Sequence, residues 1–263
     1  MLLIDQYAYA NRLLHVHPAE KFLFAVATMA VCLFSRSPVT FLAVIVLMAG
    51  VTTLGAGIPG RFFANLMLVP ATFLVAGVAT IVISLDKNPV GFIYAITLGE
   101  HVVGVRSQDL MIATNLFFKS LGAVSCLYFL SLTTPMVEII ALLRRLKVPA
   151  LFVELMTLIY RFIFVLMETA ERTHISQASR LGYSSLKNSY VSLSRLSSTL
   201  FLRSYHRSHA MFTALLSRRY DGQLNVLEST YSLSKKNLAF IAVAELLLIA
   251  LAWYTGGGFS WRN

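Results

Sequence analysis

The chain has 263 residues, of which 57% are hydrophobic and only 13% are charged, and it carries a net charge of +10. A soluble globular domain has about 45–50% apolar and about 25% charged residues, so this composition excludes a protein with an ordinary water-facing surface. The two cysteines both lie inside apolar runs, which excludes a disulfide scaffold, and the aromatic and aliphatic content excludes intrinsic disorder. The composition therefore predicts a polytopic membrane protein.

Five apolar stretches have the length expected of membrane-spanning helices. A helix needs about 20 predominantly apolar residues to cross a bilayer core of roughly 30 Å. The predicted spans are residues 22–35, 37–60, 62–85, 110–131 and 238–254, and the first of these is short and crosses only with a tilt or with help from its flanks. Residues 88–108 are mixed in composition and predict an external loop. The expected fold is an all-α polytopic membrane protein with about five transmembrane helices.

Basic residues are concentrated in one insert between the fourth and fifth predicted spans. Residues 132–237 hold 14 of the 22 basic residues and six of the 12 acidic ones, which gives this segment a charge of +8. Basic loops stay in the cytoplasm, so the insert is predicted to be cytoplasmic, although a long loop constrains orientation less than a short one. Counting spans backwards puts the N-terminus inside, and the last span leaves the C-terminus outside.

This pattern divides the chain into three predicted regions. Residues 1–131 form a membrane region with about four spans, residues 132–237 form cytoplasmic coupling helices, and residues 238–263 form the last span with an external tail. The insert is predicted to contain helices over about residues 135–147, 150–180 and 187–219, bounded by prolines, hydroxyl caps and glycines. In the second helix, Glu154, Arg161 and Glu168 recur every seven residues and predict one polar stripe on an otherwise apolar helix. The sequence leaves open whether residues 150–170 enter the bilayer.

The second and third insert helices end alike. Ser179-Arg180 closes the second helix just before a Gly and a Tyr, and Ser217-Arg218-Arg219 closes the third before a Tyr and a Gly. Arginine at a helix C-terminus is favoured by the helix dipole, so a single copy is explained by capping alone. Two copies 38 positions apart in one basic insert favour a further role, in which two equal arginine ends meet a partner with two equivalent pockets.

With these features the chain resembles the transmembrane T component of energy-coupling factor (ECF) transporters, in the cobalt-type CbiQ branch. The paired arginines resemble the coupling motifs of that family, usually Ala-Arg-Gly or a close variant, and Leu181 and Arg219 stand where the family often has Gly. Further similarity lies at residues 4–9, 11–12, 17–18, 21, 134–149, 159–162 and 220–222. The resemblance covers nearly the whole chain and is most specific over residues 133–222.

The resemblance implies a coupling scaffold of the cell (inner) membrane that binds no nucleotide and carries no cofactor. Two ABC-type ATPase subunits would move on ATP, and Arg180 and Arg218 would each enter a groove on one of them. The motion would pass to a CbiM-type substrate-capturing membrane subunit, with a small accessory membrane subunit as a further partner, in the uptake of cobalt or nickel. Neither the metal nor the stoichiometry can be read from the sequence.

Motifs for catalysis, nucleotide binding and metal binding are missing from the sequence. It has no G-x-x-x-x-G-K-[ST] phosphate loop, so ATP hydrolysis is assigned to another chain. His206 and His209 share a helix face, but Arg203 and Arg207 beside them repel cations, so we expect no metal site. The basic charge is explained by topology and partner contact, and we expect no nucleic-acid partner. An integral membrane enzyme without a visible catalytic constellation, or a transporter that works without an ATPase, is the alternative function.

Lys119 and Glu245 are the ionisable residues within the predicted spans. Counted from the ends of their spans, they lie about 15 Å and about 12 Å deep from opposite faces at 1.5 Å per residue. Both therefore reach the middle third of a core of roughly 30 Å, where charged groups are usually paired. We expect an intramembrane ion pair between them, with a Lys119 that snorkels to the interface as the alternative.

Overall fold

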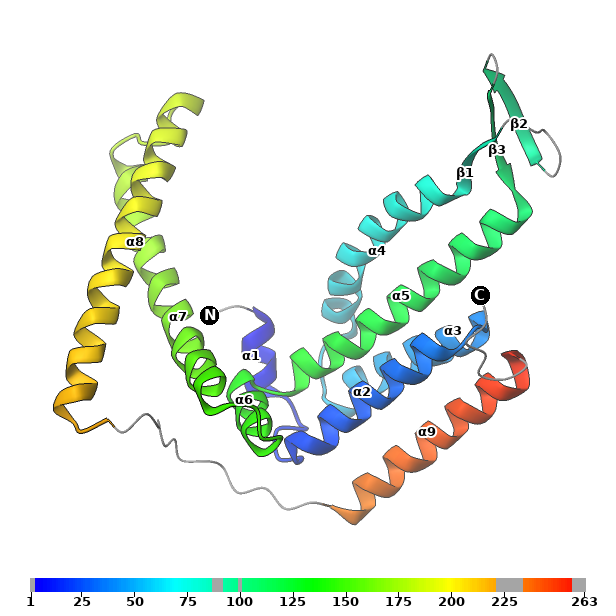
Figure 1. The fold of residues 1–263 in the computed structure, drawn as a ribbon, viewed down its shortest axis with the longest axis horizontal. Coiled ribbons are helices and arrows are strands. Elements are labelled where there is room, and N and C mark those ends of the chain that lie inside the picture. Colours follow the sequence, from blue (N-terminus) through cyan, green and yellow to red (C-terminus); the bar gives the residue numbers. More distant parts are fainter. Residues whose placement is uncertain (1–2, 87–91, 99–100, 221–233, 257–263) are drawn as a thin grey trace. The chain divides into compact units, whose positions relative to one another are not determined.

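The computed structural model describes residues 3–86, 92–98, 101–220 and 234–256. Its contacts divide the chain into two compact units. The first, which we call the bundle unit, comprises Leu2–Pro135 and Thr230–Asn263. The second, which we call the hairpin unit, comprises Met136–Ser229. Figure 1 shows the order of the helices and strands along the chain.

The bundle unit is built mainly from helices. They are α1 (Leu3–Ala10), α2 (Pro18–Phe34), α3 (Pro38–Gly50), α4 (Gly60–Val82), α5 (Ser107–Thr133) and α9 (Lys235–Gly256), and a π-helical turn, η1 (Val51–Gly55), extends α3. Pro18 and Pro38 occupy the first positions of α2 and α3, where a missing N–H costs nothing and the fixed φ angle suits a helix. His17 caps α2, because its Nδ1 accepts a hydrogen bond from the Ala19 N–H at 3.0 Å.

A small antiparallel sheet lies between α4 and α5 in the chain. Its strands β1 (Ile83–Asp86), β2 (Phe92–Leu98) and β3 (His101–Arg106) are arranged in the order β1-β3-β2. The register pairs Ile83 with Val105 and Leu98 with His101. The prediction of a loop over residues 88–108 is therefore wrong for β2 and β3, whose β-branched and aromatic residues favour extended pairing over the breaking effect of the glycines. Residues 88–91 and 99–100 of that predicted loop lie outside the described residues.

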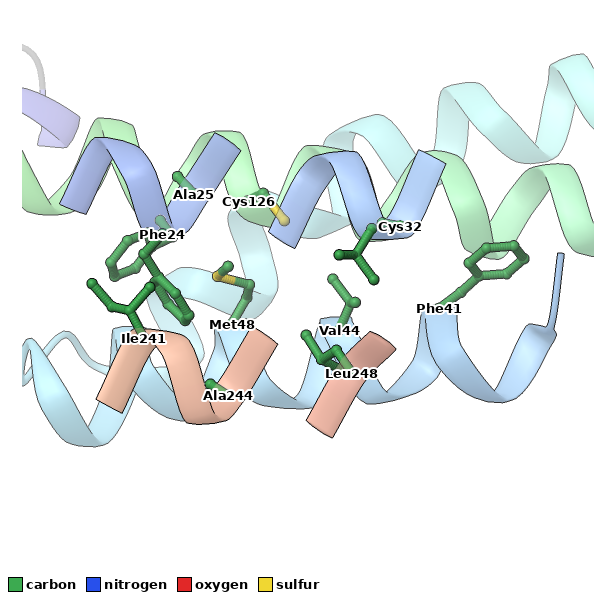
Figure 2. Packing of buried hydrophobic residues seen from close by; sticks show 12 residues of the cluster. Phe24, Ala25, Cys32, Phe41, Val44, Met48, Cys126, Ile241, Ala244 and Leu248 are labelled. Carbon is green, nitrogen blue, oxygen red and sulfur yellow. The ribbon is translucent and has the colours of Figure 1, made fainter. Parts of the chain in front are cut away.

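The helices α2, α3, α5 and α9 pack around a shared apolar core. Its buried members are Phe24, Ala25, Val31, Cys32, Phe41, Val44, Met48, Cys126, Phe129, Ile241, Ala244 and Leu248. Figure 2 shows side chains of α2, α3 and α9 turned toward one another, with Phe24 near Ile241. Phe24 also contacts Phe129 edge-to-face, with the ring centroids 5.5 Å apart. Small residues allow the close approach, since a Cβ at Gly122 of α5 would lie 2.7 Å from Cys32 Sγ on α2.

In the part of the chain that the structure describes, five helical segments are long and apolar enough to cross a membrane. They are Pro38–Gly55, Gly60–Val82, Gln108–Thr133, Ala150–Ser179 and Lys235–Thr255. Four of them match predicted spans, which confirms a helical polytopic membrane protein with about five such helices, to which the small sheet of β1, β2 and β3 is added. The fifth, Ala150–Ser179, lies in the predicted insert. The predicted span over residues 22–35 corresponds to α2, which is not among the five because its 17 residues extend only about 26 Å at 1.5 Å per residue.

The hairpin unit contains three consecutive helices. They are α6 (Met136–Arg145), α7 (Ala150–Ser179) and α8 (Leu186–Ser217), at the places where the sequence predicts them. α6 packs against α7, and α7 packs against α8. The start of α6 differs in one detail from the expected hydroxyl cap, because Thr134 Oγ1 is buried and has no hydrogen-bond partner among the described residues.

Candidate functional site: two arginine-capped helix ends

The ends of α7 and α8 have the same backbone geometry. Arg180 is the C-cap of α7, with φ −100° and ψ 20°, and Arg218 is the C-cap of α8, with φ −95° and ψ 15°. The next residues, Leu181 and Arg219, adopt positive φ angles of 59° and 57°. The two ends that the sequence predicts to be alike are therefore alike in conformation.

Both ends form the hydrogen bonds of a Schellman motif. At the end of α7, the Gly182 N–H donates to the Gln177 carbonyl at 2.9 Å, and the Leu181 N–H donates to the Ala178 carbonyl at 3.0 Å. The corresponding bonds of α8 run from Tyr220 to Leu215 at 3.1 Å and from Arg219 to Leu216 at 3.1 Å. This motif satisfies the last carbonyl groups of a helix and usually places Gly at the positive-φ position. Leu181 and Arg219 occupy that position here, at a cost of about 1–2 kcal/mol each for a non-glycine residue.

The serines that precede the arginines also behave identically. Ser179 Oγ donates to the Ile175 carbonyl at 2.8 Å, and Ser217 Oγ donates to the Thr213 carbonyl at 2.9 Å. Each serine thus bonds the carbonyl four residues earlier and leaves the arginine as the group that projects from the helix end. Arg180 and Arg218 are exposed. No carboxylate in the described ranges pairs with either guanidinium, so both are open to an external anion.

The α7 end is braced by the first turns of α8. Ser192 Oγ donates to the Gly182 carbonyl at 2.8 Å, and Gln177 Nε2 donates to the Ser192 carbonyl at 3.0 Å. Tyr183 Oη donates to Gln177 Oε1 at 2.8 Å and its ring lies 4.6 Å from that of His174. A Cβ on Gly182 would lie 2.7 Å from Ser192 Oγ, so only glycine fits this contact. Gly182 is predictable from the sequence as a helix stop, whereas Ser192 is not, because it lies in an ordinary serine-rich stretch.

The α8 end is braced by the first turns of α7. Tyr220 Oη donates to Glu154 Oε2 at 2.6 Å, and Glu154 is only 6% exposed. Arg161 and Glu168 are exposed, so the predicted polar stripe holds for them but not for Glu154. Because each helix end is braced by the start of the other helix, α7 and α8 form an antiparallel hairpin (Figure 1).

The expected ion pair between Lys119 and Glu245 is not formed in the described part of the chain. Glu245 Oε1 on α9 instead accepts a hydrogen bond from Thr28 Oγ1 on α2 at 2.6 Å. The Lys119 carbonyl on α5 accepts a hydrogen bond from Cys32 Sγ, also on α2, at 3.6 Å. α2 packs against both α5 and α9. Its Thr28 is therefore the partner of Glu245, the role that Lys119 was expected to have. Opposite charge and similar depth in the membrane predict a pair, but they do not specify which helices are neighbours.

Comparison with known proteins shows that one family is similar to this chain over most of its length. It matches the family described as CbiQ, cobalt transport protein, over residues 10–228. A protein described as uncharacterized from Methanocaldococcus jannaschii is 34% identical over 253 residues, which cover 96% of this chain and 93% of that protein. The cobalt transport protein CbiQ of Salmonella typhimurium is 32% identical over 223 residues, 85% of this chain and 99% of the relative.

A fused protein from a third organism adds a further likeness. The fused cobalt transport protein CbiMQ of Methanocorpusculum labreanum is 29% identical over 249 residues, which cover 95% of this chain and 41% of the fused protein. The family match spans most of the chain and includes both arginine-capped helix ends. This chain therefore belongs to the CbiQ family of cobalt transport proteins.

Proposed function

We propose that this chain is the transmembrane coupling subunit of an ECF-type transporter for cobalt or nickel, and that it transmits the motion of two ATPase subunits through Arg180 and Arg218. Membership of the CbiQ family makes it a component of membrane cobalt transport. The observation that carries the finer proposal is the pair of arginine-capped ends, which share one conformation and lie at opposite ends of one hairpin.

The spacing of the two ends suits a partner with two equivalent grooves. Between Glu154 and Ser179, α7 rises about 38 Å at 1.5 Å per residue, so Arg180 and Arg218 are separated by about that length. One guanidinium then docks on each of two identical ATPase subunits. When those subunits close or open on ATP, the change in distance between their grooves acts on the two ends of α7 and α8.

Arginine suits this contact better than lysine. Its planar guanidinium holds a carboxylate with two parallel hydrogen bonds and stays charged when water is removed. The Schellman turns fix the backbone on which each arginine stands, so a displacement of the partner carboxylate moves the whole helix end. Ser179, Ser217 and Arg219 act as supports of the docking arginines in this proposal.

The remaining partners follow from the same role. A CbiM-type membrane subunit captures the substrate, and the relative named as a fused CbiMQ protein supports a direct association with such a subunit. A small accessory membrane subunit is a further partner. The chain lies in the cell (inner) membrane as a multi-pass protein with a cytoplasmic N-terminus, and ATP hydrolysis belongs to the ATPase subunits.

Co-purification tests the docking step. The chain is expressed with its native neighbours, and the Arg180→Ala/Arg218→Ala double variant is compared with Arg172→Ala/Arg195→Ala, which removes two exposed arginines from the same two helices. Truncation of an arginine anchor commonly costs about 2 kcal/mol or more of binding, so the first variant should lose the ATPase and the second should keep it. Retention of the ATPase by the first variant would contradict the proposal, and a wild-type chain that brings down no ATPase would favour a transporter that works alone.

A further inference from the structure

The chain leaves the bundle unit after Pro135 and returns to it after Ser229. α5 ends at Thr133, just before the chain leaves, and α9 begins at Lys235, shortly after the chain returns. A displacement of the hairpin unit that travels along the backbone therefore reaches the bundle unit at two places, the end of α5 and the start of α9.

Both of these helix ends lack a side chain of the charge that the helix dipole favours there. The last turn of α5 has no basic residue, and the first turn of α9 has no acidic residue. α9 instead begins with Lys235 and Lys236, whose charges oppose the positive end of its dipole. The complementary charge must therefore come to each end from another helix.

α2 supplies both charges from two adjacent residues near its start. Lys21 Nζ donates a hydrogen bond to the Thr133 carbonyl at 3.0 Å. Glu20 accepts one from the Ser234 N–H at 2.7 Å and one from Asn237 Nδ2 at 2.9 Å. Both charged side chains are buried, so breaking these bonds would leave a charge without water or a partner. One turn of α2 thus holds both helix ends that adjoin the hairpin unit.

The end of α5 is held firmly as far as the point where the chain leaves the bundle unit. Asn11 Nδ2 also donates to the Thr133 carbonyl, at 3.3 Å, so this oxygen has two side-chain donors. Residues 132–135 are all buried, and Pro135 has no N–H with which to continue the helix. Because buried and hydrogen-bonded backbone opens last, a displacement at Pro135 is delivered to Thr133 and through Lys21 to α2.

We propose that Glu20 and Lys21 form a clamp that passes the coupling motion of the hairpin unit to the membrane helices. α2 packs against α3, α5 and α9, so a movement received at its start is shared by the whole core of the bundle unit. Without the clamp, α5 and α9 would move separately, and the motion would be lost between them. Glu20 and Lys21 are positioning residues, since they act through the helix ends that they hold. The inference rests on the proposed coupling role of Arg180 and Arg218.

The amount of cobalt transported per ATP hydrolysed tests the clamp. The complex of this chain with its native neighbours is reconstituted in vesicles that enclose ATP, and cobalt uptake and ATP hydrolysis are measured at equal subunit content. Glu20→Gln/Lys21→Met leaves the net charge unchanged and should keep the ATPase subunits and their hydrolysis. The cobalt-to-ATP ratio should fall about fivefold or more, as expected when coupling between two sites is lost.

The single changes test each half of the clamp. Glu20→Gln alters the shape least, because the amide oxygen still accepts from the Ser234 N–H, whereas the charge and the bond from Asn237 are lost. Glu20→Gln and Lys21→Met should each lower the cobalt-to-ATP ratio, since each releases one of the two helix ends. A wild-type ratio in both single variants and in the double variant would overturn the proposal.

A core variant separates the clamp from simple destabilisation. Leu248→Ala removes buried atoms of α9 outside the clamp and should lower the Tm in detergent. Its cobalt-to-ATP ratio should stay at the wild-type value, because both helix ends remain held. An equal fall of the ratio in Leu248→Ala would show that any loosening of the bundle unit has this effect, and the clamp would be wrong.

The arginine variant shows which proposal has failed. Wild-type uptake by Arg180→Ala/Arg218→Ala would overturn the coupling role and the clamp with it. Loss of uptake by Arg180→Ala/Arg218→Ala, together with an unchanged cobalt-to-ATP ratio in Glu20→Gln/Lys21→Met, would overturn the clamp alone.

Discussion

Glu20 and Lys21 are neighbours on α2, yet each holds the end of a different helix. Glu20 Oε1 accepts a hydrogen bond from the Ser234 N–H at 2.7 Å, and Oε2 accepts one from Asn237 Nδ2 at 2.9 Å, at the start of α9. Lys21 Nζ donates to the Thr133 carbonyl at 3.0 Å, at the end of α5. An acid thus meets the positive end of one helix dipole and a base meets the negative end of another. The two residues are 2% and 3% exposed.

This arrangement predicts that Lys21→Met destabilises the bundle unit. The change leaves the Thr133 carbonyl without its charged donor, and loss of such a bond costs about 1.5–3 kcal/mol. Thermal unfolding of the purified protein in detergent should show a lower Tm than the wild type. Lys236→Met removes an exposed base of α9 and should leave the Tm unchanged. Equal transition temperatures for the two variants would show that Lys21 does not hold α5.

A double-mutant cycle on Thr28 and Glu245 tests the contact between α2 and α9. The hydroxyl-to-carboxylate hydrogen bond of 2.6 Å predicts a coupling energy of about 0.5–2 kcal/mol between Thr28→Val and Glu245→Leu. The cycle of Lys119→Met with Glu245→Leu should instead be additive within about 0.5 kcal/mol, because no ion pair joins these residues. Coupling in the second cycle and additivity in the first would reverse this assignment.

Gly182→Ala is expected to open the turn that presents Arg180. The new Cβ would lie 2.7 Å from Ser192 Oγ and 2.8 Å from the Gln177 carbonyl oxygen, and the backbone oxygen cannot move away as a side chain can. The clash costs about 1–3 kcal/mol, which overpacking of a tight contact usually costs. Trypsin should then cleave after Arg180 faster than in the wild type. Gly77→Ala meets no atom within 4 Å and serves as the control, for which we expect unchanged cleavage.

The helices and the two arginine ends were predictable from sequence because they depend on local signals. Long apolar runs, prolines at helix starts and the repeated Ser-Arg pair each act over a few neighbouring residues. Thr28 as the partner of Glu245, and Glu154 as the partner of Tyr220, were not predictable, since each contact joins residues far apart in the chain. The sheet is not predictable in the same way, because glycines that favour a loop alternate there with β-branched residues that favour a strand.

The positive φ angles of Leu181 and Arg219 lie between the features that could be predicted from the sequence and those that could not. The resemblance places Gly at these positions, and the side chains present here suggest a different helix end. The structure retains the left-handed turn despite the side chains, because the Schellman hydrogen bonds and the braces from Ser192 and Glu154 hold it. Conformation at these two positions therefore follows the motif rather than residue propensity.

Cysteine labelling from outside the cell determines whether α7 crosses the membrane. If residues 132–237 are cytoplasmic, with four spans before them and one after them, a cysteine replacing Gly257 is labelled and one replacing Gln223 is not. If α7 crossed fully, α8 would lie outside and the order of the two results would be reversed. The measurement requires a membrane-impermeant reagent and a background in which Cys32 and Cys126, both buried, are replaced by serine or alanine.

Cobalt uptake tests the central claim that the two arginine-capped ends transmit ATP-driven motion. Radiolabelled cobalt uptake is measured in cells that express this chain with its native neighbours, at equal membrane levels of each variant. Arg180→Ala/Arg218→Ala should abolish uptake, each single change should reduce it, and Arg172→Ala/Arg195→Ala should leave it near the wild-type level. Normal uptake by Arg180→Ala/Arg218→Ala would contradict the account.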